Sequence, residues 1–100
     1  RTFCYVSDLV RGLIAAMNCD FHEPINLGQP EEVSILQIAK EILSLVPESK
    51  SRITFEPGPS YDPRVRKPDI TRARQILGWS PQVPRIEGLA RVVDYHRQFM

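Results

Sequence analysis

The residues best suited to chemistry lie in one cationic stretch, DPRVRKPDITRARQILGWSP, from Asp62 to Pro81. Its charged residues are Arg64, Arg66, Lys67, Arg72 and Arg74 against Asp62 and Asp69, five minus two, or +3, in a chain whose total is +1. A helix expected to begin near Asp69 adds free backbone N–H groups, which together with guanidinium and ammonium groups suit phosphate oxygens. The stretch therefore predicts a phosphate-bearing ligand, and the alternative is a solvated basic surface.

Composition limits the class of protein. One hundred residues with 42% hydrophobic content predict a single small domain, residues 1–100, with a modest core. The nearly balanced net charge argues against a nucleic-acid partner. No apolar run approaches the roughly 18 residues that cross a bilayer, and no signal-peptide pattern is present, so we expect a soluble protein without a membrane partner.

Few residues could hold a metal or a disulfide. Cys4 and Cys19 do not make a disulfide framework, and this indicates a reducing compartment. His22 and His96 have no ligand partners at metal spacing, so we expect no metal site. The chain also lacks the G-x-G-x-x-G and G-x-x-x-x-G-K-[ST] loops, so it encodes no recognisable dinucleotide or triphosphate site of its own.

Hydrophobic spacing predicts the elements that position the cationic stretch. We expect strands over 3–6, 25–27 and 52–56, and helices over 9–17, 35–46, 70–77 and from about 85 toward 99. Ser7 or Asp8 would cap the first helix, and Ser34 with Gln37 would cap the second. Trp79 follows a helix-ending glycine and is expected in the core. The fold class predicted is α/β, a small helix-rich lobe with short strands.

Three segments together resemble one family. They are RTFCYVSD (1–8), INLGQPEE (25–32) and the cationic stretch with its KPDI-x-R-A-x-x-x-LGW-x-P pattern. In this order and spacing they resemble the C-terminal substrate-binding part of extended short-chain dehydrogenase/reductase enzymes (the NAD-dependent epimerase/dehydratase family) that act on nucleotide sugars. Within it, the pattern is most similar to the UDP-glucuronate decarboxylase (UDP-xylose synthase) branch.

The resemblance implies a fold, a reaction and a missing part. Family members hold NAD and a Tyr-x-x-x-Lys pair in an N-terminal Rossmann domain, and neither is encoded here. The chain begins with Arg1 rather than Met, so we expect a fragment that is inactive alone. In the decarboxylase branch, oxidation of the sugar at C4 gives a β-keto acid that loses carbon dioxide, and the ketone is then reduced to give UDP-xylose.

The resemblance also implies the substrate-binding residues Arg1, Tyr61, Asp62 and Arg66. Arg1 opens the R-x-F-x-Y-V-x-D motif and would contact the pyrophosphate and sugar, and it is a candidate auxiliary catalytic residue. Asp62 would contact the ribose, with a turn-forming Asp as the alternative. Tyr61 stands where decarboxylases commonly have an acidic residue, and Pro59 stands where many epimerases have Arg. This departure shifts phosphate binding to Arg1 and Arg66.

Two other functions remain open at this point. One is a nucleotide-sugar 4,6-dehydratase or 4-epimerase of the same superfamily, which these motifs separate poorly from a decarboxylase. The other is a free-standing module that binds a phosphorylated ligand or an acidic protein. The resemblance further implies a homodimeric parent and a cytoplasmic location, although Golgi-anchored relatives exist.

Overall fold

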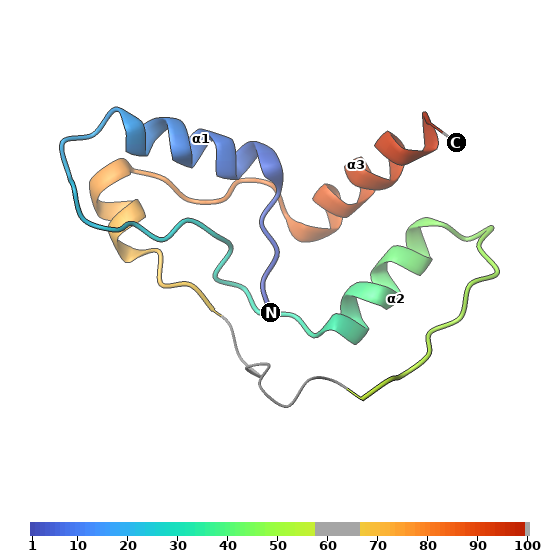
Figure 1. The fold of residues 1–100 in the computed structure, drawn as a ribbon. Coiled ribbons are helices and arrows are strands. Elements are labelled where there is room, and N and C mark those ends of the chain that lie inside the picture. The colour runs from blue at the N-terminus through green and yellow to red at the C-terminus, as the bar shows by residue number, and fades with distance from the viewer. Residues whose placement is uncertain (58–66, 100) are drawn as a thin grey trace.

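Four helical elements organise the chain, and the computed structural model describes residues 1–57 and 67–99. They are α1 (Val6–Met17), α2 (Ile35–Leu45), the short π-helix η1 (Ala73–Leu77) and α3 (Arg85–Arg97). Figure 1 shows two halves: α1 lies beside η1, and α2 lies beside α3. Of the described helices, none has the length and apolar character that a membrane crossing requires.

Two helix boundaries confirm the sequence prediction. The Ser34 hydroxyl accepts a hydrogen bond from the Gln37 N–H at 3.0 Å, so it caps the start of α2, which ends before Pro47. Gly78 ends η1 with φ 61°, in the left-handed region that glycine adopts without steric cost. The Gly78 and Trp79 N–H groups both donate to the Ala73 carbonyl, which closes the turn.

The three predicted strands are not observed. Within residues 1–57 and 67–99, the segments 3–6, 25–27 and 52–56 form no strand. Tyr5 is already the N-cap of α1, and its carbonyl accepts from the N–H groups of Asp8 and Leu9. Alternating apolar residues favour a strand only where a neighbouring backbone pairs with them, and that pairing depends on tertiary context rather than on the segment itself.

The core of the α1 half forms around Trp79, which is 1% exposed and confirms the prediction from sequence. Ile70 and Ala73 are buried with it, and the partly buried residues packed on this cluster are Cys4, Ile25, Leu27 and Leu77. A Cβ at Gly12 would lie 2.9 Å from the Trp79 Nε1 atom. Glycine therefore lets the backbone of α1 approach the indole ring closely.

In the α2 half, an ion pair joins α2 to α3. The Arg85 guanidinium donates to both carboxylate oxygens of Glu41, at 2.9 and 2.8 Å. These hydrogen bonds lower the pKa of Glu41 and raise that of Arg85. Beyond this pair, an apolar hollow of about 670 Å³ opens between the two helices, walled by residues that include Ile42, Val46 and Val93.

Candidate functional site

Asp8 fixes the segment that follows Trp79, and this corrects its predicted role as a helix cap. Its carboxylate is buried and accepts from the backbone N–H groups of Gln82 and Val83, both at 3.0 Å. The backbone of Asp8 also contributes, because the Trp79 Nε1–H donates to the Asp8 carbonyl at 2.9 Å. Arg11 donates to Asp8 Oδ1 at 3.2 Å. We call Asp8, Arg11 and Trp79 with the 80–83 backbone the Asp8 clamp.

The ionisation of Asp8 follows from these contacts. Burial acts to raise its pKa, but the hydrogen bonds from Val83, Gln82 and Arg11 outweigh burial, so the pKa lies below its usual value. Asp8 is therefore a charged structural carboxylate at neutral pH. The R-x-F-x-Y-V-x-D pattern identified this residue but not its partners, which lie more than 70 positions away.

Arg1 is held beside the segment that leads into α2. Its N-terminal nitrogen donates to the Val33 carbonyl at 3.2 Å, and the Val33 N–H donates back to the Arg1 carbonyl at 2.8 Å. This reciprocal pair is the hydrogen-bonding arrangement of two antiparallel strands. It fixes the backbone of Arg1 although the side chain is exposed.

Arg1 and the end of the cationic loop line one hollow. A polar hollow of about 470 Å³ is walled by Arg1, Thr2, Lys67 and Pro68. A second, of about 260 Å³, shares Lys67 and Pro68 and is otherwise lined by Pro30, Asp69, Ile70, Thr71 and Arg74. Residues 66 positions apart in sequence thus meet, and their guanidinium, ammonium and hydroxyl groups are donors suited to phosphate oxygens. We call these two adjoining hollows the cationic hollow.

The 25–28 segment holds one wall of the cationic hollow in place. The Asn26 side-chain amide donates to the Asp69 carbonyl at 3.4 Å. A Cβ at Gly28 would lie 3.0 Å from the Pro68 Cγ atom, so glycine allows Pro68 to lie against this backbone. Ile25 and Leu27 in turn pack on the Trp79 core. The wall is therefore anchored to the best-packed part of the chain.

The charged residues near the cationic hollow have different tasks. Asp69 Oδ1 accepts from the Thr71 hydroxyl and, at 2.9 Å, from the Thr71 N–H, and these bonds lower its pKa. Asp69 thus caps the helical turn at Thr71, near the place where the sequence predicted a helix to begin. Arg72 turns away: it donates to the Pro24 carbonyl at 2.9 Å and lies over the Phe21 ring. Arg72 is a structural residue, whereas Lys67 and Arg74 line the hollow.

The predicted site residues are only partly placed. Arg1 lines the cationic hollow. Tyr61, Asp62 and Arg66 lie outside the described residues. The hollow adds Thr2, Lys67 and Arg74, which the sequence reasoning did not select as site residues. The signal for Lys67 was present, because it belongs to the cationic cluster and directly precedes Pro68 and the capping Asp69.

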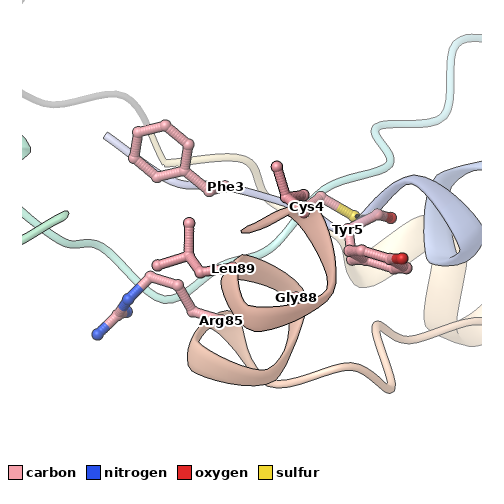
Figure 2. Close-up of a pocket in the computed structure, with 7 residues that line it drawn as sticks. Phe3, Cys4, Tyr5, Arg85, Gly88 and Leu89 are labelled. Carbon is pink, nitrogen blue, oxygen red and sulfur yellow. Dashed lines mark hydrogen bonds between the residues drawn. The ribbon is translucent and has the colours of Figure 1, made fainter. Parts of the chain in front are cut away.

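A second, apolar pocket lies where residues 3–5 cross α3. Figure 2 shows Phe3 and Tyr5 on either side of this crossing, with Gly88 beneath. The pocket measures about 180 Å³. Burial is the main cause that raises the pKa of the Cys4 thiol, which stays protonated at neutral pH. Among the described residues no three His, Cys, Asp or Glu side chains form a metal-binding group. The lining of this pocket is mostly apolar and includes Phe3, Leu89 and Val92.

Sequence relatives identify the kind of enzyme to which the chain is related. No protein-family model matches the chain. It is 50% identical over 95 residues to UDP-glucuronic acid decarboxylase 1 of Danio rerio. The aligned segment covers 95% of this chain and 22% of that protein. It is 49% identical over 98 residues to UDP-glucuronic acid decarboxylase 1 of Xenopus tropicalis, covering 98% of this chain and 23% of that protein. The chain is homologous to part of the UDP-glucuronic acid decarboxylases. It spans less than a quarter of the length of these curated relatives.

Solved structures show the same fold. The UDP-glucose 4-epimerase of Thermotoga maritima, determined with UDP-glucose, superposes with a TM-score of 0.91 at 30% identity, over 99% of this chain and 32% of that one. The UDP-glucuronic acid 4-epimerase of Bacillus cereus, determined with UDP-glucuronic acid and NAD, gives 0.85 at 31% identity, over 100% and 32%. The decarboxylase homologue thus has the fold of the matching third of an extended short-chain dehydrogenase/reductase, as its motifs predicted.

Proposed function

We propose that this chain is the C-terminal nucleotide-sugar-binding lobe of an NAD-dependent UDP-glucuronate decarboxylase, which converts UDP-glucuronate to UDP-xylose. The observation that carries the proposal is identity of 49–50% with decarboxylases over almost the whole chain. The parent polypeptide, meaning the longer chain that would contain these 100 residues, supplies the Rossmann domain. We expect it to be a cytoplasmic homodimer.

The lobe binds the diphosphate of the substrate through the cationic hollow. Arg1 offers a planar guanidinium that can donate two parallel hydrogen bonds to phosphate oxygens, and Lys67 adds a second positive charge in the same hollow. Arg66 directly precedes Lys67, so it extends this group of donors. Tyr61 and Asp62 contact the sugar and the ribose from the preceding loop, where two carboxylate oxygens suit a vicinal diol.

NAD binding falls to the rest of the parent polypeptide. When bound, NAD supplies oxidation at C4 of the sugar and the later return of the hydride. The described helices of this chain do not fit the cofactor, since α1, α2 and α3 begin after Tyr5, Ser34 and Pro84 rather than after a glycine-rich phosphate loop. What this chain contributes is therefore recognition and orientation of the substrate.

A UDP-sugar 4-epimerase is the second candidate. It is favoured by one specific observation, the TM-scores of 0.91 and 0.85 with two such epimerases. Those matches are at 30% and 31% identity, whereas the decarboxylases match at 49–50%. The higher identity favours the decarboxylase.

Product analysis of the parent polypeptide tests the proposal. The purified parent is incubated with UDP-glucuronate and NAD, and the nucleotide sugars and released carbon dioxide are quantified. We expect UDP-xylose and one equivalent of carbon dioxide, and no turnover by the 100-residue chain alone. Conversion to UDP-galacturonate without carbon dioxide would identify an epimerase. A native protein whose intact mass is the 11.5 kDa of this chain would overturn the lobe assignment.

The substrate-binding role of the loop needs its own variant. Calorimetric titration of the parent with UDP, UDP-glucuronate and UMP is repeated with Arg66→Ala, and Arg72→Ala serves as the matched control because Arg72 is engaged by Pro24 and Phe21. Arg66→Ala should lower the affinity for UDP and for UDP-glucuronate by about tenfold to a hundredfold, and it should lower the affinity for UMP less. Equal weakening by both variants would contradict a specific phosphate contact.

A further inference from the structure

Helix α1 has large apolar side chains on the face that points away from the rest of the chain. At 3.6 residues per turn, these side chains fall within an arc of about 140°. They are Val6, Leu9, Val10, Leu13, Ile14 and Met17. All six are exposed, with Leu13 at 51%, Ile14 at 55% and Met17 at 82%. We call this arc the outer face of α1.

The opposite face of α1 is already occupied. Asp8 and Gly12 are buried there, and Ala15 and Ala16 are half-buried. The close approach of Gly12 to Trp79 and the hydrogen bonds of Asp8 fix this face against the core. Rotation of the helix cannot therefore bury the outer face inside this chain.

The distribution of residue sizes is the reverse of that in a surface helix. A helix at the edge of a domain normally turns its large apolar residues inward and its polar residues outward. In α1 the small residues face inward and the large apolar ones outward, while Ser7 and Arg11 are its only polar residues besides the buried Asp8. A helix that is apolar on nearly all sides is stable in water only when covered on both faces.

The size of the chain relative to its homologues indicates what covers the outer face. The epimerase chains that share this fold are about three times longer, since this chain covers 32% of them. The accessible surface here is 7833 Å², whereas a folded monomer of 11.5 kDa exposes about 5,800 Å². The chain therefore has surface to bury, and in its homologues a large further part of the same polypeptide is available to bury it.

We infer that the outer face of α1 is the surface on which the rest of the parent polypeptide docks, through an apolar patch of that part. The covered residues are Val6, Leu9, Val10, Leu13, Ile14 and Met17. This inference rests on the proposed function in one respect, that the chain is a lobe of a longer polypeptide. It goes beyond it by placing α1 between the Trp79 core and the other domain, so that the Asp8 clamp also fixes the domain interface.

Cysteine labelling of the parent polypeptide tests this inference. Met17→Cys and Leu13→Cys are placed on the outer face, and Lys40→Cys, at an exposed polar position of α2, is the matched control. Labelling rates with a maleimide are measured by mass spectrometry of the modified peptides, which separates these sites from Cys4 and Cys19. We expect both outer-face cysteines to react at least about tenfold more slowly than the control in the native parent, and all three to react alike in urea.

Each result has a distinct meaning. Outer-face cysteines that react as fast as the Lys40→Cys control in the native parent would overturn the inference, since Met17 is 82% exposed in this chain. Protection that disappears on dilution would also overturn it, because the partner would then be a second copy. The readout does not depend on turnover: protection without carbon dioxide release would refute the proposed reaction and leave the docking surface standing.

Discussion

The two halves of the chain, α1 with η1 and α2 with α3, are each stabilised by a different kind of interaction. In the α1 half, Trp79 is enclosed at 1% exposure and the buried Asp8 carboxylate is satisfied by backbone N–H groups from 74 and 75 positions away. In the α2 half, the ion pair between Arg85 and Glu41 joins the helices, and their apolar side chains leave a hollow of about 670 Å³. We therefore call the α1 half the packed half, because a buried core stabilises it, and the α2 half the bridged half, because an ion pair connects its two helices.

This difference bears on where the candidate site is anchored. Pro68 and Asp69, in the wall of the cationic hollow, are held by Gly28 and Asn26, whose neighbours Ile25 and Leu27 pack on the Trp79 core. Arg1, in the other wall, is paired with Val33 just before α2. The cationic hollow therefore lies between the two halves, and disruption of the packed half should disturb it more.

Trp79→Ala should have the largest effect on the packed half. The indole is fully enclosed and its Nε1–H donates to the Asp8 carbonyl, so the variant leaves a cavity and an unpaired acceptor. We expect the free energy of unfolding to fall by about 3–5 kcal/mol, measured by urea unfolding followed by circular dichroism. Tyr95→Ala, at a position 59% exposed on α3, is the control and should cost less than about 1 kcal/mol. Equal losses would mean that the two halves are packed alike.

The positions of the helices were predictable from sequence because each carries local signals, but two of their starts were not: α1 begins at Val6 rather than at residue 9, and η1 spans Ala73–Leu77 rather than 70–77. Ser34 caps α2, Gly78 ends η1, and the apolar spacing of α3 begins at Arg85 as predicted. The strands were not predictable, because a run such as 3–6 becomes a strand only when another backbone pairs with it. The prediction that Ser7 or Asp8 caps α1 was wrong: the N-cap is Tyr5 without a side-chain cap, and the Asp8 carboxylate instead accepts from Gln82 and Val83 at the other end of the chain.

For the candidate site, the sequence predicted candidate residues but not which of them lie together. Residue types and motif order selected Arg1 and the cationic stretch, because charge and spacing are visible in a sequence. Lys67, rather than Arg72, lines the same hollow as Arg1. Its position depends on the contacts of segment 67–70 with Asn26 and Gly28, which are tertiary contacts that a sequence does not display. Neighbouring basic residues thus acquired different roles from packing alone.

Asp8→Asn should have the next largest effect, and one that depends on pH. Because the pKa of Asp8 is lower in the folded chain, its charged form stabilises the fold, fully at neutral pH and less as the pH falls below about 4 toward the folded pKa. We expect a loss of about 2–3 kcal/mol at pH 7, which shrinks at pH 3. Parallel urea unfolding of the two proteins from pH 7 to pH 3 measures this. A gap that is constant over that range would mean that the charge of Asp8 contributes nothing.

Glu41→Gln should have the smallest effect, and it tests whether the bridged half depends on charge. The variant keeps one oxygen acceptor for Arg85 but removes the charge that holds both hydrogen bonds. The urea midpoint of unfolding should fall less than in Asp8→Asn, and the fall should be smaller at high salt, because ions screen a pair near the surface. Glu87→Gln removes an ion pair within α3 whose side chains are 48% and 50% exposed, and it should change the midpoint still less. If Glu41→Gln instead cost as much as Asp8→Asn and ignored salt, the α2 half would be packed like its neighbour, and the contrast between the two halves would fail.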